Sequence, residues 1–235
     1  MKVPPAQSLD LALLEHRSDA ATLAYRGEHA VSVAAFLADV EATARKLRPA
    51  EWVLNVCGDR YRFAVGLAAA LLRGQITLLP PSSAPELLKS LRDEYADCAA
   101  LVDSADHAHG LTDIVEVVDT GKHGALPQRL IDVPRVPADR IAVIAFTSGS
   151  TGRPLPQAKT WGSLVQGARE EALGLGLSVD APIVLVGTVP AQHMYGLESS
   201  VILAWCNGWA FHRGRPLFPA DVAQALAQFA TGIPV

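Results

Sequence analysis

The chain has 235 residues, and 50% of them are hydrophobic. Its mean hydropathy is +0.22 and its formal net charge is -4. This apolar content is enough for a sizeable core, which excludes an intrinsically disordered chain. Lys and Arg residues form no basic run, so nucleic acid is not expected as a partner. The most apolar segment, residues 63–72, is much shorter than the roughly 20 residues of a membrane-spanning helix, so we expect no membrane span.

Cysteine and histidine usage gives no indication of a metal or disulfide site. The cysteines are Cys57, Cys98 and Cys206. They are far apart and form no Cys-x-x-Cys pair, so we predict reduced, buried thiols. Three histidines fall in expected loops without cysteine, namely His107, His109 and His123. We therefore predict no metal site. Residues 1–7 lack the features of a secretory signal, so we expect a cytoplasmic protein.

In chain order, apolar segments of strand length alternate with longer helical patterns. The expected strands span residues 21–25, 52–56, 76–79, 99–102, 114–118, 141–146 and 183–186. The expected helices span residues 32–47, with Ser32 as the N-cap, and 61–73, 84–95 and 220–229. Such alternation predicts a parallel sheet covered on both faces by helices. Two polar segments that contain Gly and Pro, residues 103–110 and 120–138, are expected to be connections.

A loop rich in glycine and hydroxyl side chains follows the apolar segment at residues 141–145. Residues 146–154 read Phe-Thr-Ser-Gly-Ser-Thr-Gly-Arg-Pro. Glycines let backbone N–H groups approach an anion closely, and serine and threonine hydroxyls add further donors. The order of residues fits neither the Walker pattern nor the Gly-x-Gly-x-x-Gly fingerprint of dinucleotide binding. The segment therefore predicts a phosphate-binding loop of a third kind.

The loop resembles the signature loop of the adenylate-forming superfamily, which includes acyl-CoA synthetases, aryl-acid ligases, peptide-synthetase adenylation domains and luciferases. A second segment, Pro-Ala-Gln-His-Met-Tyr-Gly-Leu at residues 190–197, resembles the next motif of that superfamily. The resemblance implies an α/β fold of layered sheets flanked by helices, as in the N-terminal subdomain of those enzymes. It also implies ATP-dependent activation of an aryl or acyl carboxylic acid to an acyl-adenylate. Pyrophosphate is released, and the acyl group passes to acyl carrier protein or CoA.

The resemblance also implies which residues bind the reactants. The residues that would cradle the β- and γ-phosphates of ATP, with Mg²⁺ bridging phosphate oxygens, are Thr147, Ser148, Gly149, Ser150, Thr151 and Gly152. His193, Tyr195 and Gly196 are expected to line the acid pocket, and His193 is the strongest candidate of the three. The catalytic candidates are Lys159 and His193, and we do not assign His193 the role of general base. Trp205 and Trp209 follow nearby, and we favour a core role for both because buried indoles are usually core residues.

The chain departs from the superfamily directly after the loop, where most relatives have lysine and this chain has Leu155. The first lysine beyond the loop is Lys159. It is either a cation on the phosphate side or a solvated charge at the start of the helix through Leu164 and Val165. Residues 154–161, Pro-Leu-Pro-Gln-Ala-Lys-Thr-Trp, resemble a subgroup that activates aromatic hydroxy acids for transfer to acyl carrier protein in aryl-polyene and xanthomonadin pathways. Leu155 leaves the handling of pyrophosphate open.

The segments that complete the active site in relatives are not found before Val235. These are an adenine-contacting Tyr-Gly-x-Thr-Glu segment, a ribose-binding Asp, and a C-terminal lid with a catalytic lysine. We therefore expect residues 1–235 to be the N-terminal part of an AMP-binding domain, truncated and without the lid. An alternative of another class is a noncatalytic nucleotide-binding or protein-interaction module, which Leu155 and the missing second half favour. A third, an α/β protein without any nucleotide role, requires both motifs to be coincidental.

Overall fold

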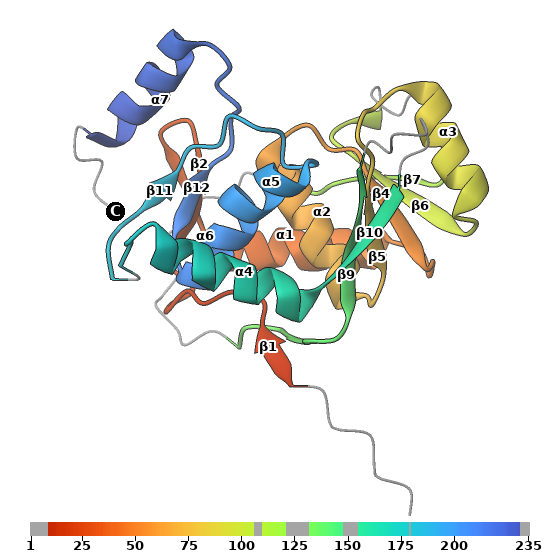
Figure 1. Ribbon diagram of the computed structural model, residues 1–235, viewed down its shortest axis with the longest axis horizontal. Coiled ribbons are helices and arrows are strands. Elements are labelled where there is room, and N and C mark those ends of the chain that lie inside the picture. The colour runs from red at the N-terminus through yellow and green to blue at the C-terminus, as the bar shows by residue number, and fades with distance from the viewer. Residues whose placement is uncertain (1–8, 106–109, 121–131, 148–154, 179, 231–235) are drawn as a thin grey trace, which may run out of the picture.

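The computed structural model describes residues 9–105, 110–120, 132–147, 155–178 and 180–230 (Figure 1). Its largest sheet is mixed and has the strand order β10-β9-β5-β4-β6-β7. The strands are β4 (Trp52–Asn55), β5 (Ile76–Leu79), β6 (Cys98–Val102), β7 (Ile114–Glu116), β9 (Ile141–Thr147) and β10 (Leu155–Thr160). All of them are parallel except β10, which pairs with β9 antiparallel and places Leu155 opposite Thr147. The all-parallel sheet expected from the sequence is corrected, because residues 148–154 are too few for a crossover connection.

A second sheet has the order β11-β12-β2-β3. Its strands are β2 (Thr22–Arg26), β3 (His29–Ser32), β11 (Val184–Leu185) and β12 (Ala210–His212). A separate two-stranded sheet pairs β1 (Asp10–Ala12) with β8 (Arg135–Pro137). The expectation that residues 120–138 form only a connection is therefore wrong for residues 135–137, which form β8. The sequence pattern did not show this, because β8 becomes a strand only through pairing with a segment that lies far away in the chain.

Helices form a layer between the two larger sheets and cover the outer face of the six-stranded sheet (Figure 1). The helices concerned are α1 (Val33–Lys46), α2 (Arg60–Leu72) and α3 (Pro85–Glu94). Helix α1 contacts β2 and β3, and α2 packs on β4 and β5. On the other face, Leu88 and Leu91 of α3 join a core cluster with Leu54 and Leu78. The expected covering of the sheet on both faces is confirmed.

Helix α1 begins where the sequence predicts. The Ser32 hydroxyl accepts a hydrogen bond from the Ala35 N–H at 3.2 Å, which satisfies one of the free donors of the first turn. The remaining elements are α4 (Trp161–Gly174), α5 (Met194–Gly196), the π-helical segment η2 (Leu197–Ile202), α6 (Leu203–Asn207) and α7 (Pro219–Ala230). Helix α4 packs against η2 and α6. Helix α7 follows the expected range of residues 220–229 and lies at one corner of the molecule (Figure 1).

The indole and thiol side chains are part of the core. Trp205 and Trp209 have exposed fractions of 0% and 2%, in agreement with the core role favoured from the sequence. Cys57, Cys98 and Cys206 are free and buried, as expected. Burial raises the pKa of the Cys206 thiol to about 12, so this thiol stays protonated at neutral pH. In the part of the chain that the structure describes, no helix is long and apolar enough to cross a membrane.

Candidate functional site

The glycine-rich loop connects the strands of a β-hairpin at one edge of the large sheet. Strand β9 ends at Thr147 and β10 starts at Leu155, directly opposite. Strands β4, β5 and β6 run parallel to β9, so their carboxyl ends lie at this same edge. Ligands of open α/β sheets bind at the carboxyl ends of the strands. The other predicted phosphate-binding residues lie outside the described residues, namely Ser148, Gly149, Ser150, Thr151 and Gly152.

A cavity of about 490 Å³ opens at this carboxyl edge. The segments that follow β4 and β5, together with residues from two later turns, form its wall. The lining residues are Val56, Gly58, Pro80, Pro81, Ser82, Ser83, Pro190, Gln192, His193 and Arg215. Because β5 pairs with β9, the cavity opens beside the strand that leads into the glycine-rich loop. The cavity therefore lies at the edge of the sheet from which strand β9 leads into the predicted phosphate-binding loop.

A larger cavity, of about 760 Å³, lies beside α4 and α6. Two exposed ion pairs lie at its wall, Glu15 with Arg169 at 2.9 Å and Arg17 with Asp180 at 2.7 Å. None of the site residues predicted from the sequence is among its described lining residues. Size alone would favour this cavity, but the position of the smaller one at the carboxyl edge is the stronger argument.

The segment around His193 is shaped by a close backbone contact. The Pro190 carbonyl accepts a hydrogen bond from the His193 N–H at 3.1 Å, and the His193 carbonyl accepts one from the Leu197 N–H at 2.8 Å. A Cβ at Gly196 would lie only 2.1 Å from the Pro190 oxygen, so a larger residue does not fit there. Gly196 thus brings α5 against the preceding turn, and His193, at the start of α5, lines the cavity.

The three predicted pocket residues therefore occupy different environments. His193 lines the cavity, whereas Gly196 is buried and acts through its backbone contact. The Tyr195 side chain is 69% exposed and is not among the lining residues. The structure thus places one of the three side chains where it can contact a ligand in this cavity, and the roles of all three stay predictions.

Lys159 lies in β10, opposite Val143, and not at the start of a helix. Helix α4 begins at Trp161, and the Thr160 hydroxyl caps it by accepting a hydrogen bond from the Ser163 N–H at 3.2 Å. The expectation of a helix start at Lys159 is corrected, because the hairpin continues to Thr160 before the chain turns. At about 3.3 Å per residue, Lys159 is on the order of 13 Å from Leu155 along the strand. Lys159 is half-buried at this position, and both interpretations of it stay predictions.

Arg60 fixes the two turns that carry the cavity's polar residues, and the sequence analysis did not single it out. Its guanidinium donates to the carbonyls of Gly187 at 3.0 Å and Val189 at 2.7 Å, just before the His193 segment. It also donates to the carbonyls of His212 at 3.2 Å and Gly214 at 2.7 Å, in the turn after β12. Arg60 is only 2% exposed, and this burial lowers its pKa to about 10. The sole sequence signal is that Arg60 and Arg62 are the only charged residues of the helix and lie at its start.

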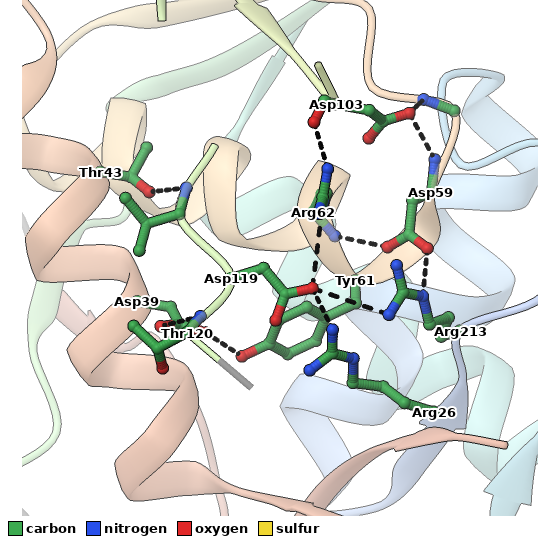
Figure 2. A network of polar contacts seen from close by, with 12 residues as sticks. Arg26, Asp39, Thr43, Asp59, Tyr61, Arg62, Asp103, Asp119, Thr120 and Arg213 are labelled. Atoms are coloured by element: carbon green, nitrogen blue, oxygen red, sulfur yellow. Dashed lines mark hydrogen bonds and ion pairs between the residues drawn. The ribbon is translucent and has the colours of Figure 1, made fainter. Parts of the chain in front are cut away.

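A polar network lies beside the cavity, around the start of α2 (Figure 2). Asp59 caps α2 by accepting a hydrogen bond from the Arg62 N–H at 3.0 Å, and it also pairs with Arg213. Asp103 accepts hydrogen bonds from the backbone N–H groups of Gly58 at 2.6 Å and Asp59 at 3.1 Å. Burial raises the pKa of the Asp103 carboxyl. These contacts fix the backbone at Gly58, which is one wall of the cavity.

Asp119 is the centre of this network. Its side chain is 1% exposed and faces three arginines (Figure 2). Nε of Arg62 and Nη1 of Arg213 each lie 3.6 Å from Oδ2 of Asp119, and Arg26 is in closer contact with the same oxygen. A buried carboxylate of this kind holds together elements from distant parts of the chain. Asp119 falls in a segment that sequence reasoning left between an expected strand and an expected connection, where an isolated Asp carries no distinguishing signal.

Within the described ranges, no group of three or more His, Cys, Asp or Glu side chains is placed to bind a metal ion. His107, His109 and His123 lie outside the described residues. Magnesium that enters together with a nucleotide needs no such protein cage, since Mg²⁺ usually keeps several waters and is bound by substrate phosphates with one or two carboxylates.

Solved structures with a similar fold include a CoA synthetase and the N-terminal subdomain of another protein. One is o-succinylbenzoate CoA synthetase (MenE) from Bacillus subtilis in complex with the acyl-adenylate intermediate, with a TM-score of 0.72 and 19% identity over 94% of this chain and 60% of that chain. Another is the N-terminal subdomain of Klebsiella oxytoca NpsA in complex with 3-hydroxyanthranilyl-AMSN, with a TM-score of 0.66 and 14% identity over 88% and 52%. The fold is that of the N-terminal subdomain of adenylate-forming enzymes.

The chain is also similar in sequence to part of a much longer protein. A segment of 135 residues is 30% identical to a nonribosomal peptide synthetase, cm3A, from Cordyceps militaris, covering 54% of this chain and 3% of that protein. No family model matches the chain. MenE has also been solved with ATP and a magnesium ion, and that structure has a TM-score of 0.71 and 20% identity over 94% of this chain and 62% of its own. The chain thus spans 44% to 62% of the MenE chains and 3% of the peptide synthetase.

Proposed function

We propose that the protein containing this chain activates a carboxylic acid with ATP, forming an acyl-adenylate and pyrophosphate. The observation that supports this proposal most directly is the position of the 490 Å³ cavity, which is lined by His193. The cavity opens at the carboxyl edge, beside the strand that leads into the Thr-Ser-Gly-Ser-Thr-Gly loop. The adenylate-forming fold supports this proposal, as does the MenE structure that contains an acyl-adenylate. An acid in the cavity and a triphosphate on the loop would meet at this edge.

The reaction joins two negatively charged reactants. A carboxylate oxygen attacks the α-phosphorus of ATP, a new carbon–oxygen–phosphorus anhydride forms, and the bond to the β-phosphate oxygen breaks as pyrophosphate leaves. The protein must hold both reactants in line and offset the charge on the phosphates. In this proposal, the loop residues 147–152 donate N–H and O–H groups to the β- and γ-phosphates, and His193 contacts the acid.

Magnesium bound with the nucleotide would neutralise part of the phosphate charge, which fits the ATP and magnesium complex of MenE. The described residues offer no separate cage for it. Binding and orientation by the chain's own residues therefore remain the protein's contribution: the loop holds the triphosphate, and the cavity holds the acid.

The acid and the acyl acceptor are narrower proposals. The motif at residues 154–161 favours an aromatic hydroxy acid as substrate and acyl carrier protein as acceptor, and CoA is the other acceptor that the fold supports. Activation and transfer would both take place in the cytoplasm. Residues 1–235 would supply the N-terminal part of the AMP-binding domain, and the lid would come from outside this chain.

A second candidate is a noncatalytic nucleotide-binding or interaction module. The observation that favours it is Leu155, which is 52% exposed at the start of β10, where most relatives place a lysine. An exposed leucine offers no charge to departing pyrophosphate. The two candidates differ in whether the bond between the α- and β-phosphates of ATP is broken.

The test is acid-dependent exchange of labelled pyrophosphate into ATP, measured on the chain and on the longest open reading frame that contains it. We expect exchange with at least one aromatic acid and a strong decrease in the double variant Thr147→Ala, Ser148→Ala. Full activity in the double variant would remove the loop from the mechanism. Tight ATP binding without exchange for any acid would instead favour the noncatalytic module.

A further inference from the structure

Among the described residues, Arg215 contributes the one guanidinium that lines the cavity at the carboxyl edge. It follows β12 and shares the wall with His193, Gln192, Ser82 and Ser83. No Asp or Glu is among the described lining residues. Within the part of the chain that the structure describes, Arg215 forms no ion pair and no side-chain hydrogen bond. The described wall of the cavity therefore contains a cation without an anion.

The other arginines of this region are already engaged. Arg213, two residues before Arg215, pairs with Asp59 and faces Asp119, which also faces Arg26 and Arg62 (Figure 2). The carboxylates around the start of α2 are thus directed at other guanidinium groups. Arg215 is exposed, and none of these carboxylates pairs with it.

A buried cation, Arg60, lies near the exposed Arg215. Arg60 bonds to four backbone carbonyls and forms no ion pair among the described residues. After burial, which is the main cause, the charge of Arg215 contributes to the lowered pKa of Arg60. The two charges therefore lie near enough to repel each other, and an anion entering the cavity would relieve that repulsion.

One acid, Asp221, lines a separate hollow of about 360 Å³ together with Arg215. Its carboxylate accepts a hydrogen bond from the Phe218 N–H at 3.3 Å at the start of α7. This contact uses one of its oxygens, and the distance to Arg215 is beyond that of an ion pair. Asp221 thus lines a different hollow from the cavity that contains His193.

We propose that Arg215 binds the carboxylate of the acid substrate in the cavity, an inference that rests on the proposed function. A guanidinium offers a planar fork of donors that matches both oxygens of a carboxylate. The turn that carries it is held in place because Arg60 donates to the Gly214 carbonyl at 2.7 Å. Arg215 would thereby select the ionised acid over neutral analogues and hold its carboxylate at the cavity wall beside His193.

The test compares Arg215→Gln and Arg215→Lys with Arg45→Gln as the matched control. Arg45 is an exposed arginine in α1 that pairs with Glu41, one helical turn away. In the exchange assay with 4-hydroxybenzoate, we expect Arg215→Gln to raise the KM of the acid about 10- to 100-fold, as for the loss of a charged hydrogen bond, while the KM of ATP changes less than about twofold. Arg215→Lys should restore part of the loss.

Inhibition by 4-hydroxybenzamide separates carboxylate binding from a merely structural role. The amide should bind wild type much more weakly than the acid, and Arg215→Gln should remove this preference by weakening only the acid. An unchanged KM for the acid, or an equal rise in the KM of ATP, would overturn the inference while leaving the proposed function intact.

Calorimetric titration of the chain with 4-hydroxybenzoate tests Arg215 even if the exchange assay fails. Binding by wild type that Arg215→Gln loses, together with no exchange in any variant, would contradict the proposed function and support the carboxylate site. Equal binding by wild type and Arg215→Gln, or no binding of the acid by either, would overturn the inference.

Discussion

A Cβ at Gly187 would lie 2.5 Å from Nη2 of Arg60, because the buried guanidinium is bonded to the carbonyl of that same glycine. Neither partner can move away easily. The backbone at residue 187 precedes the His193 segment, and the guanidinium is held by three further carbonyls. The glycine and the arginine are therefore a matched pair that sets the shape of the cavity wall.

From this contact we expect Gly187→Ala to lower the free energy of unfolding by about 2 kcal/mol, the cost of overpacking a rigid site. Urea denaturation followed by circular dichroism measures the change. Gly167→Ala in α4 is the matched control, since nothing lies within 4 Å of the added methyl group. Its expected effect is a stabilisation of roughly 0.5–1 kcal/mol. Equal urea midpoints for wild type and Gly187→Ala would contradict the packing argument.

Asp119→Asn should destabilise the protein by about 3 kcal/mol, because it leaves three arginines facing a neutral group in a buried position. The control is Asp180→Asn, which breaks the ion pair between Asp180 and Arg17. In this pair the Arg17 side chain is 80% exposed and the Asp180 side chain is 71% exposed. That variant should change the free energy of unfolding by no more than about 0.5 kcal/mol. Similar effects of both substitutions would show that the network around Asp119 does not stabilise the fold.

Local patterns were sufficient to predict most elements of the fold. Strand β5 has the predicted bounds, because a short apolar run lies between a helix end and Pro80. Ser32 caps α1 as expected, since capping depends on residues three positions apart. The sequence could not reveal β8, which pairs with the distant β1, or the hydrogen bonds of Arg60 to carbonyls more than 120 residues away.

The candidate site was predictable to a similar degree. The two motifs correctly indicated the fold, and the structure places His193 in the wall of the cavity at the carboxyl edge. Tyr195 belongs to the same motif, but the start of α5 turns its side chain toward solvent. Arg215 was not singled out, because an isolated arginine in a turn carries no pattern, and only the cavity shows its relation to His193.

Stability should fall on acidification in a way that depends on His16. Burial lowers the pKa of this histidine from 6.5 to about 4, with Nε2 3.1 Å from the Trp209 carbonyl. The unfolded chain takes up the proton below pH 6.5 and the folded chain only near pH 4, so acidification favours unfolding in this interval. Between about pH 7 and pH 5 the loss from His16 should be about 2 kcal/mol.

The measurement for His16 is urea unfolding at both pH values for wild type and His16→Gln. The variant should lose about 2 kcal/mol less than wild type between about pH 7 and pH 5. Burial also lowers the pKa of His212, so that a smaller dependence of the same sign should remain in both proteins. An identical pH dependence in wild type and variant would show that His16 is not the group responsible.

His193→Ala should raise the KM of the acid several-fold, on the order of 3- to 10-fold, because it removes a side chain from the cavity wall. The motif predicts that Tyr195 lines the acid pocket, whereas in the structure Tyr195 is 69% exposed and lies outside the cavity lining. Tyr195→Ala distinguishes these two positions. We expect a smaller change for Tyr195→Ala. Steady-state exchange kinetics with a panel of aromatic acids decides between them, and an unchanged acid profile for His193→Ala would make His193 a structural residue.

The most direct test of the account is pyrophosphate release from ATP with a panel of aromatic and aliphatic acids, measured on the chain and on the longest open reading frame that contains it. The account predicts release that depends on the acid and accompanies a stoichiometric acyl-adenylate, at least in the longer protein. No release and no ATP binding in either protein would contradict it, and the glycine-rich loop would then have no role in nucleotide chemistry.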